Sequence, residues 1–434
     1  MRSTKPAVGF IFITLLLDVL GFGLLIPVAP SLVKSLLHGG AGGTDKEAAP
    51  YVAALMATFY TMSFLFAPLL GVLSDRFGRR PVILIALLGS GLDYFAMALA
   101  PTLPWLFATR IVNGLSGASM TVASAYVADV TPPQKRAAAF GMIGAAFGLG
   151  FVIGPWMGGQ LSAIDIRAPF YAAGALTIVN WLYGMFVLPE SLPLERRSPV
   201  KIARCNPVGA YAHVAAYPLV LGLAVSLFLL NMAQFGLHAT WALYTGHRYG
   251  WDAKHIGWSL FAVGITAALV QGGLARKLIP RLGEPRALLI GVGIAVLAYF
   301  GYGLAPEGWM VYCIVAVASL GGIAQPACQA IITAQVGPMQ QGTIQGALTS
   351  MQSVAGIMGP LIGGWAFSHF ITDDPRMIQN GAPFFVSGTL GVVGLVIAAY
   401  TMKAWPPPEA VSHPHPERPP DEPVPEQSDA PSAT

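Results

Sequence analysis

The sequence predicts an all-α membrane protein with 12 transmembrane helices, arranged as two six-helix pseudo-repeats. The prediction rests on its composition, on a series of long apolar runs and on an internal repeat. The chain has 434 residues, of which 55% are hydrophobic and only 10% are charged. Soluble domains carry about 25% charged residues. A chain this poor in charge cannot cover a water-facing surface, so most of it must lie in a bilayer.

Apolar runs long enough to cross a bilayer recur along the chain, since a spanning helix needs about 20 residues. We place the spans at 8–36, 51–73, 82–100, 105–128, 137–162, 170–189, 217–245, 255–276, 286–304, 309–333, 342–370 and 383–403. An even number of spans puts both termini on one side of the membrane. Most loop lysines and arginines fall on that side, so the positive-inside rule predicts that both termini are cytoplasmic.

A glycine-proline pattern occurs twice, 205 residues apart, and divides the chain into two halves. In the first half the pattern comprises Gly154, Pro155, Gly158 and Gly159, and it returns as Gly359, Pro360, Gly363 and Gly364. We therefore predict a six-helix bundle over 1–189, a cytoplasmic linker over 190–216, a second bundle over 217–403 and a disordered cytoplasmic tail over 404–434. Parallel repeats of this kind bind substrate between the halves, and access alternates as one half rocks against the other.

The glycines of the first copy also predict close helix packing. Small residues let helices approach one another, and a proline weakens the helix locally. The helix-packing motif comprises Gly150, Gly154, Pro155, Gly158 and Gly159.

Three charged residues fall inside predicted spans of the first half. Asp18 lies midway along the first span, Asp93 midway along the third, and Arg110 near the start of the fourth. A charge at the bilayer centre costs about 2.5–3.5 kcal/mol on insertion scales, so such residues usually serve ions, protons or substrate. The carboxyl groups are candidates to carry a proton, with Arg110 as modulator or counter-charge. Buried structural hydrogen bonds are the alternative for the acids, and snorkelling to the interface is the alternative for Arg110.

The predicted spans of the second half contain no acid. His238 is the one plausible titrating group there, although a lone histidine in an apolar span is more often a core residue. Gln271 and Gln329 are neutral polar groups within spans. Each can bind substrate through hydrogen bonds or pair with a neighbouring helix.

A short charged loop joins the second and third spans and carries the predicted gate. Its residues are Gly71, Asp75, Arg76, Gly78, Arg79 and Arg80, and a second charged loop contributes Asp129 and Arg136. Basic residues alone would fit a topogenic loop. An acid at this place can also pair with the arginines, or accept from the start of the eleventh span and so latch one state of the protein.

The sequence predicts no enzyme, because it contains no nucleophile–base set, phosphate-binding loop or metal cluster. Its three cysteines lack metal-type spacing. We expect no cofactor and no resident metal. The expected partners are a small-molecule substrate, protons and the lipid bilayer, with no nucleic acid; the oligomeric state is not readable. A membrane receptor without transport is a different class of function, and the acids at 18 and 93 argue against it.

These motifs together resemble those of major facilitator drug/proton antiporters, and most closely the tetracycline efflux proteins of Gram-negative bacteria. The resemblance runs along nearly all of residues 8–403. Its more specific pieces lie around Asp93, over 248–251 and over 340–346. It implies proton-coupled efflux of tetracycline as a divalent-cation chelate, with Mg²⁺ as part of the substrate, across a bacterial inner membrane. It also assigns transport roles to Asp18, Asp93, Arg110 and Gln271, and a gating role to the charged loop.

This chain departs from that family pattern at two positions important for proton coupling. The family has an acid in the ninth span and a histidine in the eighth, where this chain has Ala295 and Ala267. Either coupling rests on the first-half acids alone, or the substrate or stoichiometry differs. Transport of another drug or metabolite, or weakly coupled transport, therefore stays open beside tetracycline efflux.

Overall fold

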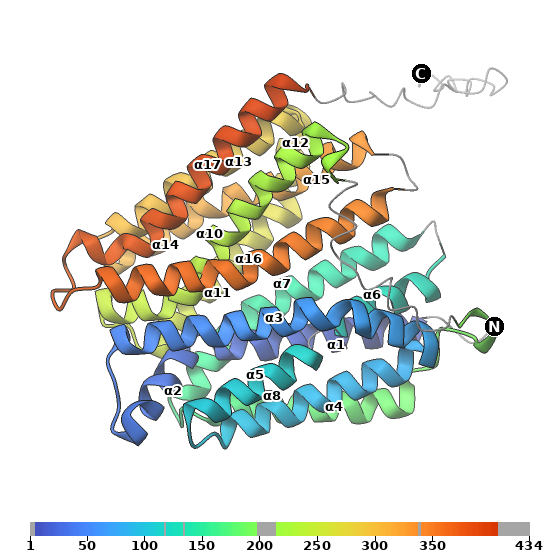
Figure 1. Cartoon of the computed structure of the whole chain (residues 1–434), viewed down its shortest axis with the longest axis horizontal. Helices are drawn as coiled ribbons and strands as arrows, with labels where there is room; N and C mark the ends of the chain where they lie inside the picture. Colours follow the sequence, from blue (N-terminus) through green and yellow to red (C-terminus); the bar gives the residue numbers. More distant parts are fainter. Residues whose placement is uncertain (1–4, 117–118, 133–134, 198–213, 337–339, 407–434) are drawn as a thin grey trace, which may run out of the picture.

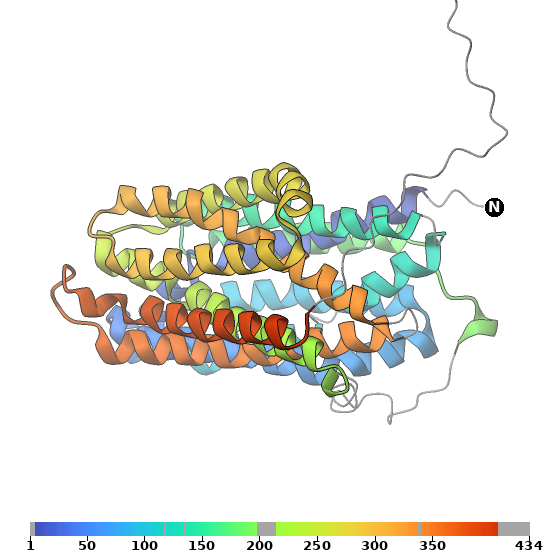
Figure 2. The same ribbon diagram turned by 90° about the horizontal axis from the view of Figure 1, so that it is seen from above.

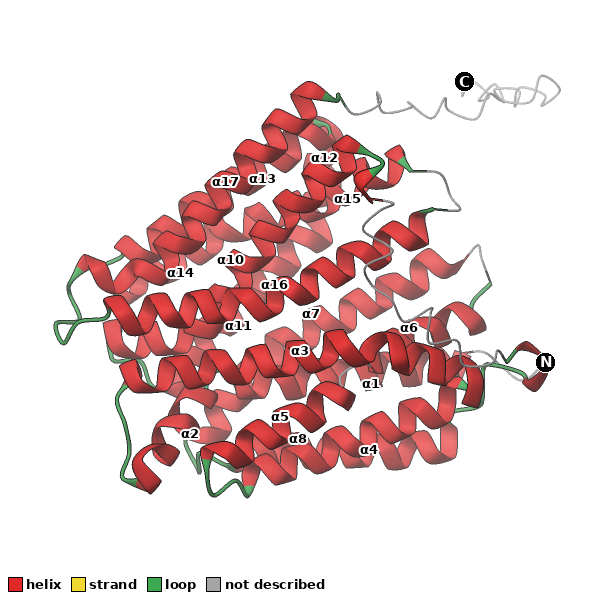
Figure 3. Ribbon diagram, in the orientation of Figure 1, coloured by secondary structure: helices red, strands yellow, loops and turns green. Residues whose placement is uncertain are grey.

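The computed structural model describes residues 5–116, 119–132, 135–197, 214–336 and 340–406. Over these ranges it contains helices and turns but no strand (Figure 3). Most of the predicted linker and nearly all of the predicted disordered tail lie outside the described residues. The predicted all-helical fold is confirmed.

The first half begins with α1 (Lys5–Leu25) and α2 (Ala29–Leu36), which are bent by 50° relative to one another. The helices that follow are α3 (Asp45–Phe77), α4 (Arg79–Ala98), α5 (Leu103–Ser116), α6 (Ser119–Val130), α7 (Arg136–Ser162) and α8 (Ala168–Val187). Local signals set the ends of α3. Thr44 and Glu47 form a capping box at its start. Gly78 ends it with φ +103°, a conformation that favours glycine.

The second half contains three irregular spans. Its helices are α10 (Pro218–Tyr249), α11 (Ala253–Leu269), α12 (Ala275–Leu282), α13 (Glu284–Leu304), α14 (Gly308–Ala318), α15 (Ala324–Gln335), α16 (Gln341–Phe370) and α17 (Ala382–Ala404). A π-turn, η5 (Val270–Leu274), joins α11 to α12, and a 3-10 turn, η6 (Ser319–Ile323), joins α14 to α15. A further 3-10 turn, η7 (Ile378–Gly381), leads into α17, the third irregular span.

Among the described residues, nine helical segments are long and apolar enough to cross a membrane, or ten when α1 and α2 count as one span. Helices are also present in the two remaining predicted spans, 105–128 and 342–370. Residues 105–128 are divided between α5 and α6, on either side of the undescribed positions 117–118. Helix α16 has the length to span the membrane but is not among the apolar segments, because its first half is rich in glutamine, serine and threonine.

The helices run roughly parallel, and both described ends of the chain lie on one side of the bundle. Helix α1 starts and α17 ends toward the right of Figure 1, and the same end of the bundle lies to the right in Figure 2. We call this the terminal side and the opposite side the distal side. The sequence predicts that the terminal side is cytoplasmic.

The two halves meet through α3 against α16 and α7 against α11. On the distal side the contact is between backbones: a Cβ added to Gly159 would lie 2.5 Å from the Ala253 carbonyl oxygen, and one on Gly364 would lie 3.1 Å from that of Ala49. On the terminal side of the same helices, a Cβ on Gly144 or Gly346 would meet no atom within 4 Å. The halves are therefore closed together on the distal side and apart on the terminal side, as the diverging α3 and α16 show in Figure 1.

Candidate functional site

Asp93 and Arg110 form a buried ion pair inside the first half. The Arg110 guanidinium donates to Asp93 Oδ2 at 2.9 Å, and the Asn113 amide donates to the same oxygen at 2.7 Å. Asp93 is 3% exposed and Arg110 is 7% exposed, so Arg110 does not snorkel to the interface. Asp93 Oδ1 has no hydrogen-bond partner among the described residues. The carboxylate is thus held by one oxygen, while the other remains available.

Asp18 lies on α1, which packs mainly against α7 and α8 and meets α4 at the Tyr94 side chain. Gly21, one turn further along α1, faces the Tyr94 hydroxyl so closely that an added Cβ would lie 2.6 Å from it. Tyr94 is buried and follows Asp93 directly on α4. The acids of the first and third spans therefore belong to one region, with Tyr94 at the contact.

A cavity of about 80 Å³ brings together candidates from opposite halves. Its lining includes Arg110 and Met97 from the first half and His238 from α10 of the second. The aromatic rings of Phe151 on α7 and His238 lie 5.7 Å apart, which makes another contact across the halves. His238 is therefore at the interface between the halves and not in the core of one bundle.

A second cavity, of about 400 Å³, occupies the centre of the second half and also reaches His238. Gln271, at the π-turn η5, lines it together with Ala267 and Ala295. Both departures from the family pattern therefore face the cavity. Gln329 lines a third cavity, of about 290 Å³. The structure does not bring Gln271 and Gln329 to the same cavity.

His238 is held by a short chain of neutral groups. The Tyr299 hydroxyl donates to Gln234 Oε1 at 3.1 Å, and Gln234 Nε2 lies 2.8 Å from His238 Nε2. Because the Gln234 oxygen is engaged by Tyr299, its amide nitrogen is directed at the imidazole as a donor. In this arrangement His238 Nε2 accepts a hydrogen bond, which requires that this nitrogen carry no proton.

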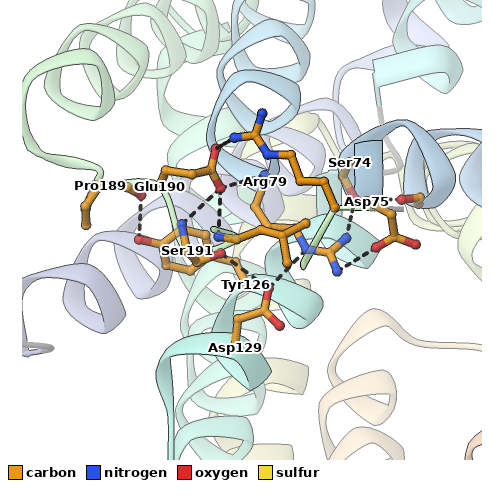
Figure 4. Close-up of polar contacts among 11 residues, drawn as sticks. Ser74, Asp75, Arg79, Tyr126, Asp129, Pro189, Glu190 and Ser191 are labelled. Carbon is orange, nitrogen blue, oxygen red and sulfur yellow. Dashed lines mark hydrogen bonds and ion pairs between the residues drawn. The ribbon is translucent and has the colours of Figure 1, made fainter. Parts of the chain in front are cut away.

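The charged loop between α3 and α4 forms a network on the terminal side (Figure 4). Arg79 pairs with Asp75 at 2.7 Å and with Asp129 at 3.1 Å, and it donates to the Ser74 hydroxyl at 2.5 Å. Arg80 donates to the Met185 carbonyl on α8 at 2.6 Å. In this state Asp75 therefore pairs, among the described residues, with an arginine of its own loop, and not with the start of the eleventh span, which was the other predicted partner.

The other loop candidates lie around this network. Arg76 is exposed, with its guanidinium 5.6 Å from the Phe77 ring centre. A Cβ on Gly71 would meet no atom within 4 Å, so its face of α3 is open. The side chain of Arg136 lies outside the described residues.

Glu190, which the sequence analysis left in the linker, is a central member of the network. Its Oε1 accepts from the backbone N–H of Arg79 at 2.9 Å and of Leu192 at 3.1 Å, and its Oε2 lies 3.8 Å from Arg197. Arg79 is the first residue of α4, so a carboxylate caps the positive end of this helix. The sequence feature that could have identified Glu190 is its position as an acid directly after the sixth span, on the side of the membrane that is rich in arginine.

The helix-packing glycines of α7 contact two different helices. Added Cβ atoms on Gly150 and Gly154 would lie 2.9 Å from the Leu16 oxygen and 2.7 Å from the Leu20 oxygen of α1. The Gly158 Cα faces the Leu24 backbone, also on α1. The Pro155 ring also lies against α1, where its Cδ would be 2.8 Å from a Cβ on Gly23. Gly159 and the Pro155 carbonyl instead face α11 of the second half, where the carbonyl oxygen would lie 2.7 Å from a Cβ on Gly257. The motif therefore joins α7 to its own half and to the other half.

The family model of the Major Facilitator Superfamily matches residues 11–360 and 307–431. The chain belongs to the major facilitator superfamily. It is a multi-pass membrane protein, and the superfamily identifies it as a transporter of small molecules.

Within the superfamily, this chain is similar to curated tetracycline resistance proteins of Escherichia coli. The class C protein is 41% identical over 80% of this chain and 86% of its own length, and the class B protein is 33% identical over 85% and 89%. A human relative, major facilitator superfamily domain-containing protein 10, is 31% identical over 82% of this chain and 86% of its own length. The resemblance predicted from the motifs is confirmed.

Solved structures have the same facilitator fold. The human organic anion transporter MFSD10 (TETRAN) superposes with a TM-score of 0.68 at 25% identity, covering 92% of this chain and all of its own. A bacterial homologue of the lysosomal transporter Spinster, inward-facing and occupied, gives a TM-score of 0.73 at 18% identity over 91% of this chain and 96% of its own.

Proposed function

We propose that this protein exports tetracycline from the cytoplasm, as its divalent-cation chelate and in exchange for protons, by alternating access across the bacterial inner membrane. The observation that carries the proposal is the buried Asp93–Arg110 pair, in a chain 41% identical to a tetracycline resistance protein. The terminal side is cytoplasmic in this proposal, and the structure corresponds to its inward-facing state.

Proton exchange requires a carboxyl group that is charged in one state and neutral in another. Asp93 Oδ2 is held by Arg110 and Asn113, whereas Oδ1 has no hydrogen bond in the described part of the chain. A proton added to Oδ1 leaves both contacts of Oδ2 in place. Rocking of the halves would change the surroundings of Arg110, because His238 of the other half lines the same cavity. This arrangement supports coupling between protonation and access.

The first test is proton release from energised everted membrane vesicles on addition of tetracycline with Mg²⁺. We expect tetracycline to dissipate the pH gradient with the unaltered protein. Asp18→Asn removes a proposed proton site and should abolish the effect. Asp373→Asn, in an exposed loop, is the matched control and should behave like the unaltered protein.

Uptake of labelled tetracycline is measured in the same vesicles. If tetracycline enters without dissipating the gradient, the carrier is uncoupled or weakly coupled. If it does not enter, tetracycline is not the substrate, and a wider compound screen follows.

Transport of another small drug or metabolite, or weakly coupled transport, is a second candidate. Ala267 and Ala295 favour it, because both face the central cavity of the second half, where the family pattern has a titratable group. Restoring an acid with Ala295→Asp should change the number of protons released per substrate only if the carrier is coupled through that cavity.

A further inference from the structure

Four glutamines of the second half face one cavity. Gln325 and Gln329 are four residues apart on α15, and Gln345 and Gln352 are seven apart on α16, so each pair lies on one helix face. All four line the cavity of about 290 Å³, together with Asn231 of α10. Part of the polarity of α16, namely Gln345, Thr349 and Gln352, thus faces this cavity.

The four side-chain amides have no hydrogen-bond partner in the part of the chain that the structure describes. Only the backbone carbonyls of Gln329 and Gln345 accept side-chain hydrogen bonds, from Thr333 and Thr349 at 2.9 Å each. By contrast, the Asn231 amide donates to the Leu227 carbonyl at 2.8 Å. Each glutamine amide offers two donors and one acceptor oxygen. Polar groups at membrane depth need such partners, from water or from a ligand.

The cavity of about 290 Å³, which we call the glutamine cavity, lies between the terminal side and the cavity of about 400 Å³, which we call the central cavity. Gln345 is one turn from the start of α16, whose first residue is Gln341. Leu227, Asn231 and Gln325 line both the 290 Å³ and the 400 Å³ cavities, so the two adjoin. A molecule entering between the halves from the terminal side can meet the glutamines before it reaches His238.

No charged side chain lines either of these two cavities among the described residues. A site of amides recognises by hydrogen bonding, because it carries no formal charge to attract or repel an ion. It favours molecules whose edge alternates donors and acceptors. It gives no advantage to a lipophilic cation, which would need an acid or an aromatic cage.

We propose that Gln325, Gln329, Gln345 and Gln352 form a loading site that binds the carbonyl-, hydroxyl- and amide-rich edge of the substrate before the substrate moves to the central cavity. The site discriminates by hydrogen bonding and not by charge. The direction of loading, from the terminal side, rests on the proposed export function; the binding chemistry does not.

The test is equilibrium binding of tetracycline with Mg²⁺ to the purified full-length protein in nanodiscs. The variant is the double substitution Gln345→Met and Gln352→Met, because methionine has nearly the shape of glutamine but lacks the amide. Losing two neutral hydrogen bonds should raise the Kd for tetracycline about 10- to 30-fold. In vesicles, KM should rise while kcat stays unchanged. Gln379→Met, at an exposed position in η7, is the matched control and should bind as the unaltered protein does.

Tetraphenylphosphonium, a lipophilic cation, tests the second part of the proposal. The Met variants should leave its binding unchanged; an equal loss for this cation would show a general effect on the protein and overturn the proposal. Tetracycline binding that is unaffected by the double substitution would also overturn it, while leaving the export function intact.

If the unaltered protein does not bind tetracycline, the proposed function fails, and the site is tested with chloramphenicol, a neutral probe with amide and hydroxyl groups. Glutamine-dependent binding of chloramphenicol supports the loading site without tetracycline as substrate. Binding that does not depend on the glutamines, or no binding of either probe, overturns the site.

Discussion

Replacing Gly159 by alanine should shift the protein away from the state described here. Gly159 is at the distal contact between α7 and α11, where an added Cβ would lie 2.5 Å from the Ala253 carbonyl oxygen and 3.2 Å from the Lys254 Cα. These are backbone atoms and cannot rotate away as a flexible side chain can. The two halves would have to separate on the distal side, and this movement opens the distal face of the protein.

The expected size of the shift follows from the cost of overpacking. Forcing an extra methyl group into a close contact costs about 1–3 kcal/mol. If the clash exists only when the distal side is closed, the whole cost acts on the equilibrium between the two states. The ratio of distal-open to distal-closed molecules should rise about 5- to 150-fold.

The assay is a distance measurement between spin labels on the terminal side of the two halves. Phe77 and Lys277 are exposed there, one in each half, and can be replaced by cysteine in a background without the native cysteines. Gly159→Ala should raise the population with the shorter distance, since the terminal side closes when the distal side opens. Gly144→Ala on the same helix is the control, because its Cβ would meet no atom within 4 Å. Equal distributions for Gly159→Ala and the unaltered protein, or an equal shift in the control, would refute the reasoning.

Two other predictions concern the charged groups. Arg110→Met leaves Asp93 buried without its counter-charge and should destabilise the protein by about 3–5 kcal/mol, measured as loss of thermal stability in detergent. Adding Asp93→Asn should restore most of the lost stability. A double variant no more stable than Arg110→Met alone would contradict the pairing. Glu190→Ala removes the cap from the start of α4 and should lower the stability of the protein by about 1 kcal/mol and reduce its transport activity. Glu190→Gln keeps an acceptor for the Arg79 N–H and should retain most of the activity. Equal effects of the two substitutions would contradict the capping role.

The spans were predictable because they depend on local composition, whereas the breaks within them depend on packing. A helix was expected over 255–276, but the sequence did not predict the π-turn at Val270–Leu274. Gly272 and Gly273 lie within this break, but a glycine pair does not by itself indicate one, because Gly158 and Gly159 stay in a regular helix. The sequence also did not predict the bend between α1 and α2, which lies at the distal side.

The candidate site was predictable in its members but not in its geometry. Asp93 and Arg110 were both identified from the cost of burying charge, and a counter-charge role was proposed for Arg110. That they touch depends on the packing of α4 against α5, which no residue pattern specifies. Glu190 was missed for a related reason: it follows the sixth span, and only the folded chain brings it to the first N–H of α4.

The glutamine face of α16 also has a consequence for how this protein is made. A segment with this many amides gains little by leaving the translocation channel for lipid on its own. We expect α16 to wait at the channel until it can pack with α10 and α15, the helices that line the cavity its glutamines face. Both helices are synthesised before α16, so α16 should insert efficiently in its own chain and poorly when it is fused behind an unrelated span.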